Sequence, residues 1–524
     1  MSTPPLKRWD TAIVLGIVLL WLAATAWMRP LMHPDEGRYA TVAWEMLRSG
    51  DWLTPTLDGM PFFHKPPLFY WITAAALWLL GPIEIAARTA SLLGASLGAI
   101  ALYLFTRRWC GLLLARRSLL VLLVLPMYFA AAQFANLDML VAGCITATIL
   151  ALADAALCFE QGCSYRRMLW LAYALAGLGL LAKGLIGFVI PAMVIGLWVL
   201  LRWRWRTLWA LVSVPGLMLL LAITAPWFIA MQQRFDGFLH YFFVVQHFQR
   251  FAATGFNNVQ PWWFYPAVLA LCSFPAVLWL RRMLTRDYFT TTDTPGAVRL
   301  LMGLSVGCVL LFFSIPQSKL LGYILPALPA LAWLIADASY LAVETTARKQ
   351  RWVITLAVSA LVGLIAVIGL SIDTRHSSKP LGVALRAHYQ AGQSVYMLKD
   401  YLYAVPFYAR LRQPVFDVDD WNDPEIARRD TWRKEIADAG SFAPALAKRL
   451  LLFPQALPAA LCHGGVAWVV GAEDAIKDYP FLAQAQVITT NNRQVVWRVD
   501  PAQHTQFVAL GCPRGSLAGH GSAQ

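Results

Sequence analysis

Long apolar runs are the feature that most limits what this chain can fold into. A helix needs about 20 mostly apolar residues to cross the hydrocarbon core of a bilayer. The sequence contains eleven runs close to that length, and we expect each to form a transmembrane helix. The expected spans are Thr11–Met28, Ala86–Phe105, Ser118–Phe134, Met139–Cys158, Leu169–Ala182, Leu185–Leu201, Leu208–Phe228, Phe264–Leu280, Val298–Ile315, Leu320–Leu341 and Trp352–Ile372. The predicted fold class is therefore an α-helical polytopic membrane protein.

Composition and charge agree with this prediction. The chain is 59% hydrophobic and 14% charged, whereas soluble proteins average roughly 45–50% and about 25%. A net charge of +14 would also suit a nucleic-acid-binding protein, but the basic residues gather between apolar runs, as the positive-inside rule predicts for cytoplasmic loops. We therefore expect no nucleic acid as a partner. The arginine-rich loops carry Arg107, Arg108, Arg116, Arg117, Arg166, Arg167, Arg202, Arg204, Arg206, Arg281, Arg282, Arg286, Arg348 and Arg351.

The spacing of these loops predicts the orientation of the chain. Lys7 and Arg8 precede the first span, so the N-terminus is expected in the cytoplasm. No small-residue cleavage site follows that span, which favours an anchor over a signal peptide. An odd number of spans then places the chain after Asp373 on the outer side. We expect a membrane domain over residues 1–372 and an outer domain over 373–524.

The outer segment has the pattern of a small α/β domain. Short strands are predicted at "SVYML", "QPVFDV" and "GVAWVVG", with a helix at "YLYAVPFYARL". The stretch "AQVITTNNRQVVWRV" predicts a hairpin that turns at Asn491-Asn492. Cys462 and Cys512 fall in this domain, where a disulfide is permitted, although their placement is as compatible with chance.

The first outer loop, about residues 29–85, carries charge at the edge of the bilayer. Asp35, Glu36 and Arg38 lie just past the first span. Leu68–Leu80 is too short to cross a membrane and is rich in aromatic residues, so we expect a helix in the membrane interface. An acid near the start of the loop and an interfacial helix near its end predict an active site that faces lipid.

The stretch "HPDEGRYATVAWEMLRSGDWLTPTLDGMPFFHKPPLFYW" resembles the first loop of the GT-C glycosyltransferases, which take sugars from polyprenyl phosphates. The similarity is strongest to the bacterial enzymes that add 4-amino-4-deoxyarabinose to lipid A, with protein O-mannosyltransferases as further relatives. The motifs "ANLDML", "LAKGLIGFVIP", "APWF", "QHFQRF" and "SKLLGYILP" extend the resemblance from about residue 33 to 329. It implies the GT-C fold and transfer of a sugar from an undecaprenyl phosphate donor.

The resemblance implies roles for three carboxylates. Asp35 is expected to act as general base for a hydroxyl acceptor, with Glu36 able to share the task. If the acceptor is an ionised phosphate, Asp35 should instead position it, bind a metal or hold Arg38. Asp138, at the edge of the fourth span, is expected to lie near the same site. The alternative is that Asp35 and Asp138 only cap helices.

The cations of the outer face fall within the same motifs. Negative charge builds on the donor phosphate as its sugar leaves, and fixed cations stabilise that charge. The residues expected to bind the donor phosphate are Arg38, Lys65, Lys183, Arg250, Lys319 and Tyr323. The alternative is that the cations anchor at lipid headgroups and that Tyr323 belongs to the interfacial aromatic belt.

A divalent metal such as Zn, Mg or Mn is the one cofactor that the resemblance suggests. Related enzymes carry a glutamate before the loop lysine, which joins a later histidine in holding the ion. This chain has His64 at that position, and His247 matches the later histidine. Two imidazoles suit zinc but make an incomplete set of ligands, so His64 could instead donate a hydrogen bond to phosphate.

Two rival functions remain. A lipid-linked sugar transporter would place charged sites at mid-membrane within inverted repeats, whereas the candidate charges here lie at one membrane face. A protein O-glycosyltransferase would have the same fold. The expectation is a monomeric glycosyltransferase of a Gram-negative inner membrane, with lipid A or another envelope molecule as acceptor and membrane lipids around its spans.

Overall fold

The computed structural model describes residues 8–249, 258–285, 288–289, 293–342, 346–462 and 465–512. Contacts divide the chain into two compact units that alternate along the sequence. Unit 1 consists of Met1–Arg29, His64–Ile72 and Arg88–Ile372. Unit 2 consists of Pro30–Phe63, Thr73–Ala87 and Asp373–Gln524. Most of the first loop, which we had assigned to the membrane domain, therefore groups with the C-terminal segment.

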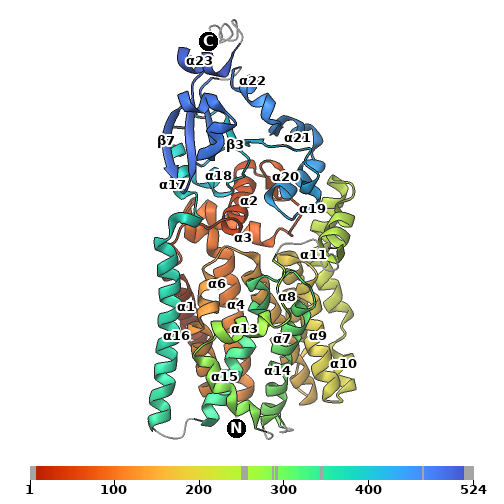
Figure 1. The fold of residues 1–524 in the computed structure, drawn as a ribbon. Helices are drawn as coiled ribbons and strands as arrows, with labels where there is room; N and C mark the ends of the chain where they lie inside the picture. The colour runs from red at the N-terminus through yellow and green to blue at the C-terminus, as the bar shows by residue number, and fades with distance from the viewer. Residues whose placement is uncertain are drawn as a thin grey trace. The chain divides into compact units, whose positions relative to one another are not determined.

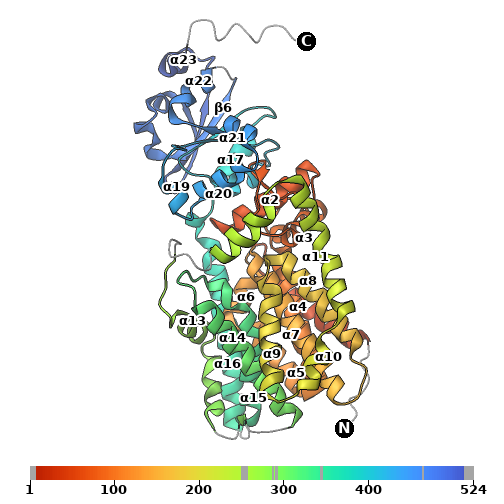
Figure 2. The same cartoon turned by 90° about the vertical axis from the view of Figure 1, so that its right-hand side faces the viewer.

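Unit 1 is built from helices (Figures 1 and 2). In chain order they are α1 (Arg8–Ala23), α4 (Glu84–Cys110), α5 (Leu112–Val124), α6 (Pro126–Ala132), α7 (Leu137–Glu160), α8 (Arg166–Lys183), α9 (Ile186–Leu201), α10 (Trp205–Leu211), α11 (Val214–Arg234), η1 (His240–Gln249), α13 (Phe264–Cys272), η2 (Ala276–Leu284), α14 (Thr294–Ser314), η4 (Leu321–Ala327), α15 (Leu328–Ala342) and α16 (Thr346–Ile372). Here η1 is a π-helix, and η2 and η4 are 3₁₀-helices.

Within the described chain, six helices are long and apolar enough to cross a bilayer, or eight if each of two bent pairs forms one span. Each of the eleven expected runs is mostly helical, but the run Leu208–Phe228 is interrupted between α10 and α11, and two other runs bend sharply. Helices α5 and α6 meet at 68°, and α13 and η2 meet at 119°. The span expected over Phe264–Leu280 is therefore a bent pair of helices, which forms either a broken span or a re-entrant loop. Pro126 and Pro275 lie at the two breaks, where a proline has no N–H for a continuing helix.

Helix α7 lies at the centre of unit 1, and 94% of its apolar 18-residue stretch is buried. It packs on α8 and α9, and it approaches α4 at a pair of glycines. A Cβ on Gly143 would collide with the backbone at Gly94, so only glycine permits this crossing. Helix α16 lies at the periphery: 17% of its apolar 18-residue stretch is buried, and its exposed apolar side chains can contact lipid.

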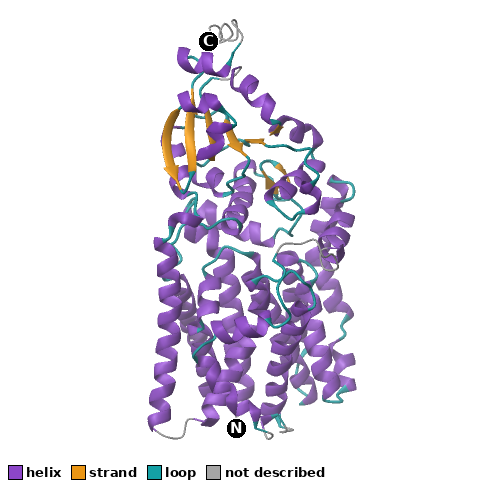
Figure 3. Ribbon diagram, in the orientation of Figure 1, coloured by secondary structure: helices purple, strands orange, loops and turns teal. Residues whose placement is uncertain are grey.

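Unit 2 holds all the strands of the described chain (Figure 3). Its first-loop elements are α2 (Asp35–Ser49), the antiparallel pair β1 (Thr56–Leu57) and β2 (Met60–Pro61), and part of α3 (Leu68–Leu80), which begins in unit 1. The bounds of α3 are those expected from the sequence. The C-terminal elements are η5 (Thr374–His376), α17 (Lys379–His388), β3 (Val395–Leu398), α18 (Ala404–Tyr408), β4 (Phe416–Val418), α19 (Glu425–Arg428), α20 (Trp432–Ser441), α21 (Pro444–Leu450), β5 (Leu451–Leu452), η6 (Pro454–Ala456), α22 (Leu457–Cys462), β6 (Ala467–Ala472), η7 (Glu473–Lys477), η8 (Pro480–Gln484), β7 (Gln486–Asn491), β8 (Gln494–Val499) and α23 (His504–Leu510).

The six-stranded sheet of unit 2 has the order β5-β4-β3-β6-β8-β7. Strands β3 to β6 run parallel, and β8 and β7 add antiparallel partners at one side. The near-continuous apolar run of β6 suits a strand buried on both faces. The expected hairpin is confirmed, although it turns one residue later than expected, at Asn492 and Arg493, which have φ values of 48° and 62°. Cys462 and Cys512 form a disulfide.

Candidate active site

The acid at the start of the first loop begins a helix of unit 2. Asp35 is the first residue of α2, and Arg38 follows one turn later, so their side chains share a helix face. The guanidinium of Arg38 donates one hydrogen bond to Asp35 and another to Glu435, which lies on α20. The N-cap residue, Pro34, makes no side-chain capping bond. The carboxylate of Asp35 thus belongs to an ion-pair network.

Two tyrosines enclose this network. The Cζ atom of Arg38 lies 4.9 Å from the ring centroid of Tyr39 and 5.6 Å from that of Tyr403. The hydroxyl of Tyr403 donates to Glu435 at 2.5 Å. Burial alone would lower the pKa of Arg38, but Glu435, Tyr39 and Asp35 together raise this pKa well above its usual value. Arg38 is therefore a permanent cation that two carboxylates hold.

A glycine in the motif allows the network to form. A Cβ on Gly37 would lie 2.9 Å from the backbone nitrogen of Ala404, so only glycine lets α2 approach α18 this closely. One turn later, the hydroxyl of Thr41 donates to the carbonyl of Tyr403 at 2.5 Å. In the motif "DEGR", Gly37, which lets α18 approach, therefore lies between the acids and the arginine.

Glu36 has different surroundings from Asp35. Its side chain is fully buried, and its carboxylate accepts a hydrogen bond from the backbone N–H of Met32 at 3.0 Å. This contact holds the turn that precedes α2. By contrast, the side chain of Asp35 is 31% exposed, so Asp35 is the acid that a bound molecule could reach.

Two further acids of the first loop are buried in unit 2. The carboxylate of Glu45 accepts from the hydroxyl of Thr56 at 2.8 Å and from the backbone N–H groups of Asp58 and Gly59, both at 2.9 Å. Asp58 in turn accepts from the N–H of Val415 at 2.8 Å. Burial raises the pKa of Glu45, and burial and nearby Glu45 raise that of Asp58 well above its usual value. These acids hold the β1–β2 hairpin and were not expected from the sequence.

A second ion pair lies in unit 1, where three expected site residues meet. Asp138 follows the first residue of α7 and forms an ion pair with Lys183, the last residue of α8. The Nζ atom of Lys183 lies 4.6 Å from the ring centroid of Tyr323. A Cβ on Gly322 would collide with the carboxylate of Asp138. The cap of α7 is Asn136, which accepts from the N–H of Asp138, so the side chain of Asp138 is available for Lys183.

Lys319 is buried and donates hydrogen bonds to the backbone. Its side chain is 4% exposed, and its ammonium group donates to the carbonyls of Gln260 and Pro316 at 3.0 and 2.6 Å. Its backbone N–H also donates to Asn258. Lys319 therefore holds two loops of unit 1 together, and at most one proton of its ammonium group remains for a ligand.

The proposed metal ligands are only partly described. His64 is 5% exposed, and its ring centroid lies 6.1 Å from that of Tyr241. Among the described residues, no three His, Cys, Asp or Glu side chains come together as metal ligands. His247 lies in η1, but its side chain is outside the described set, as is the whole of Arg250. The described residues thus do not complete a metal site. Lys65, next to His64, is half-buried.

Sequence reasoning missed Glu435, Tyr403 and Gly322. Glu435 is 397 residues from Arg38 along the chain, and no motif surrounds it. Tyr403 was noted only as part of a helical stretch. Gly322 lies inside a quoted motif, "SKLLGYILP", and a glycine beside a functional tyrosine was the one available signal for a close approach.

Comparison with known sequences gives two kinds of match. Residues 64–229 match the family described as dolichyl-phosphate-mannose-protein mannosyltransferase. An undecaprenyl phosphate-α-4-amino-4-deoxy-L-arabinose arabinosyl transferase of Pectobacterium carotovorum is 31% identical over 394 residues, which cover 72% of this chain and 68% of the relative. Arabinosyl transferase 1 of Sodalis glossinidius is 38% identical over 314 residues, which cover 59% of this chain and 55% of the relative. The matches to these two relatives thus span 55 to 68% of the relatives' own length.

Solved structures extend the likeness to nearly the whole chain. The crystal structure of ArnT from Cupriavidus metallidurans bound to undecaprenyl phosphate has a TM-score of 0.79 at 22% identity, covering 94% of this chain and 98% of that one. The oligosaccharyltransferase of Archaeoglobus fulgidus tethered with an acceptor peptide has a TM-score of 0.51 at 13% identity, covering 90% of this chain and 70% of that one. At these identities the likeness shows a shared membrane fold.

Proposed function

Because this chain belongs to the family of the undecaprenyl phosphate-α-4-amino-4-deoxy-L-arabinose arabinosyl transferases, we propose that it is a glycosyltransferase of a bacterial inner membrane. The donor is a sugar on undecaprenyl phosphate, and the acceptor is a phosphate of lipid A. The observation that carries this proposal is the pair of acid–cation contacts, Asp35 with Arg38 and Asp138 with Lys183, within the motifs that the resemblance identified.

Asp35 orients the acceptor in this proposal. A lipid A phosphate is already ionised and needs no general base, so an acid in the site acts by position. Arg38, which Glu435 holds in place, donates to the carboxylate of Asp35. This carboxylate is open enough to accept hydrogen bonds from hydroxyl groups of the acceptor. Glu36 supports the turn before the helix and makes no contact with the acceptor.

The donor phosphate is assigned to Lys65, Lys183 and Tyr323. Negative charge develops on this phosphate as the sugar leaves, and a fixed cation stabilises it. Lys183 suits this role because Asp138 and the ring of Tyr323 hold its ammonium group in place. We remove Arg38 from this set, since two carboxylates already balance its charge. Lys319 positions a loop, and Arg250 stays a proposed phosphate ligand.

A metal ion bound by His64 and His247 stays a proposal with no step assigned to it. Bound there, a divalent cation would supply further positive charge for the donor phosphate.

We also propose that the N-terminus is cytoplasmic, that unit 2 faces the periplasm, that eleven spans cross the membrane and that the protein acts as a monomer. The arginine-rich loops support this orientation.

The decisive experiment is mass spectrometry of lipid A from cells with and without this protein. Added protein should increase the mass of lipid A by one sugar residue, and that increase identifies both the sugar and the acceptor. A matched strain should carry Lys183→Ala, which should abolish the increase. Unchanged lipid A with well-inserted wild-type protein would refute the lipid A acceptor.

A second function, transfer of a sugar to a protein hydroxyl, has one specific observation in its favour. Residues 64–229 match a family described by its action on proteins, the dolichyl-phosphate-mannose-protein mannosyltransferases. For a hydroxyl acceptor, Asp35 would act as general base. Glycan analysis of periplasmic proteins from the same two strains tests this alternative, because a protein-linked sugar with unmodified lipid A would support it.

A further inference from the structure

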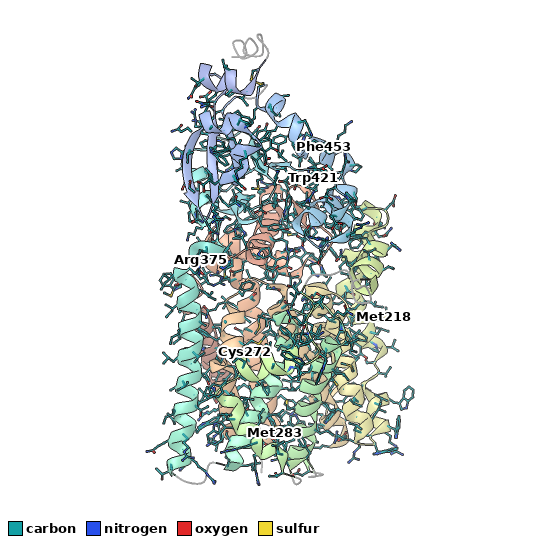
Figure 4. All side chains as sticks on the ribbon, viewed as in Figure 1. Met218, Cys272, Met283, Arg375, Trp421 and Phe453 are labelled. Atoms are coloured by element: carbon teal, nitrogen blue, oxygen red, sulfur yellow. A yellow bond between two sulfur atoms is a disulfide. The ribbon has the colours of Figure 1, made fainter. Side chains whose placement is uncertain are left out.

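A cavity in unit 1 is lined by arginines, and none of the candidate site residues lines it. It has a volume of about 610 Å³. One wall is η2 with its flanking residues, and the other is formed by the end of α15 and the start of α16. Figure 4 labels Met283, which lies on η2, and Cys272, the last residue of α13. The lining residues are Pro275, Leu278, Trp279, Arg281, Arg282, Thr285, Leu341, Ala342, Arg348, Arg351 and Thr355.

The polar part of this cavity is basic. Four arginines line it, and none of the described lining residues is acidic. Elsewhere in unit 1 arginines have carboxylate partners, such as Arg108 with Asp154 and Arg202 with Glu160, at 2.8 and 2.7 Å. Within the described parts of the chain, by contrast, no ion pair joins Arg281, Arg282 or Arg351 to an acid. Like charges around one space favour an anion between them.

The remaining lining fits a lipid better than a free anion. Leu278 and Leu341 give the cavity apolar walls that suit an acyl chain. Trp279 donates to the hydroxyl of Thr355 at 3.2 Å, and its ring centroid lies 5.4 Å from that of Trp352. Tryptophans of this kind gather at the level of lipid headgroups. The cavity also lies where α15 ends and α16 begins, which is the expected boundary between apolar core and headgroups.

We propose that this cavity binds the phosphate headgroup of an anionic phospholipid, with the diphosphate cardiolipin as the best fit. Basic pockets between membrane helices on the cytoplasmic side are suited to such headgroups. The arginines contact the phosphates, and the leucines contact the first carbons of the acyl chains. The lipid joins η2 to the end of α15 and the start of α16. This inference does not depend on the proposed transferase activity.

The test uses the full-length protein in detergent and native mass spectrometry with added cardiolipin, phosphatidylcholine or inorganic phosphate. The wild type should bind cardiolipin in preference to phosphatidylcholine. The triple variant Arg281→Gln/Arg282→Gln/Arg351→Gln should bind it roughly 10²-fold more weakly, because each basic residue near an anionic lipid contributes about a factor of five. Higher salt should weaken binding in the wild type as well.

The control is Arg166→Gln/Arg167→Gln/Arg206→Gln, which removes the same charge from exposed arginines outside the cavity. This variant should keep wild-type binding. Equal loss in both triple variants would mean non-specific attraction and would overturn the proposal. Displacement of cardiolipin by millimolar inorganic phosphate would mean a free-anion site and would also overturn it.

Discussion

Glu435 reaches across 397 residues to share the guanidinium of Arg38 with Asp35. Its second oxygen accepts from Tyr403. A buried carboxylate that accepts one hydrogen bond from an arginine and another from a phenol holds both side chains in place. At the residue scale the candidate site therefore rests on a side chain of the C-terminal segment as much as on the first-loop motif.

Asp35→Asn separates two roles of this acid. If Asp35 is a general base, activity should fall by roughly 10²–10⁴ and recover partly at high pH, where a hydroxyl acceptor ionises more readily. We expect the loss without the recovery, because the proposed acceptor is already an ionised phosphate. The measurement is the pH profile of sugar transfer by purified protein. Full activity in a folded variant would remove Asp35 from the site.

Glu435→Gln tests the positioning of Arg38. Activity should fall by roughly 10–10²-fold, since a hydrogen bond to a charged group contributes about 1.5–3 kcal/mol. Its effect should be non-additive with that of Arg38→Ala, because both residues belong to one network. A double-mutant cycle on turnover measures this coupling. The exposed acid Glu473 gives the control, and Glu473→Gln should combine additively with Arg38→Ala. Additive losses for Glu435 would place it outside the network.

Asp417 makes the stability of unit 2 dependent on pH. Its side chain is 1% exposed, and neither carboxylate oxygen has a hydrogen-bond partner among the described residues. Burial, and after it Asp58, raises its pKa well above the usual value. Its contribution to stability is thus fully present below about pH 4, the unfolded pKa, and is lost as pH rises through the folded pKa.

Asp417→Asn should therefore raise the melting temperature at pH 8 and leave it unchanged near pH 4. The amide mimics the neutral acid and is uncharged at both pH values. At pH 8 the wild-type carboxyl either ionises in a buried place or stays protonated, and either state lowers the free energy of unfolding. Thermal unfolding in detergent at the two pH values measures the difference. The exposed Asp474 supplies the control, because Asp474→Asn should change neither value. An equal gain at both pH values would contradict this assignment.

The motifs pointed to charged residues that make specific contacts, but they did not separate a ligand-binding cation from a structural one such as Lys319. Asp138, Lys183 and Tyr323 were singled out separately, and the structure brings them together. The sequence offered no such signal for Glu435, since an ion pair between distant segments leaves no periodic pattern. Of the two carboxylates on Arg38, Asp35 was an expected partner and is confirmed, whereas Glu435 is placed by the fold of unit 2.

At the scale of elements, apolar length predicted where helices lie but not where they break. The bounds of α3 agree with expectation because the aromatic run has proline or glycine residues at both ends. The 119° angle between α13 and η2 was missed, since an apolar run continues through the proline. Strand β5 was missed because two residues, Leu451–Leu452, are too few to form a pattern.

The crossing of α4 and α7 gives a prediction at this scale. Gly143→Ala should lower the stability of the membrane helices by about 1–3 kcal/mol, because the added methyl meets the backbone at Gly94 and forces the helices apart. The melting temperature in detergent reports the loss. Gly196→Ala on α9 is the matched control, since a Cβ there meets nothing within 4 Å. Equal melting temperatures for the two variants would disprove the tight crossing.

At the scale of the whole molecule, orientation is the property still to be measured. Reporter fusions after Arg108, Arg204 and Arg282 should report cytoplasm, and a fusion after Ser377 should report periplasm. The reason is the excess of arginine in the loops expected inside. A fusion after the exposed Arg166, in another of the arginine-rich loops, should also report cytoplasm and serves as an internal check. A cytoplasmic signal after Ser377 would mean that the spans number ten or twelve.

The make-up of unit 2 from Pro30–Phe63, Thr73–Ala87 and Asp373–Gln524 also dictates an order of assembly. A ribosome adds about 5–20 residues per second, so the first loop waits on the order of tens of seconds for Glu435 and Tyr403 to be made. During that interval Arg38 lacks its distant partner. A chain released early by a premature stop codon would keep this loop unfinished and exposed to proteases. A segment made late thus completes the first loop, and a chain that stops before Glu435 lacks the carboxylate that shares Arg38 with Asp35.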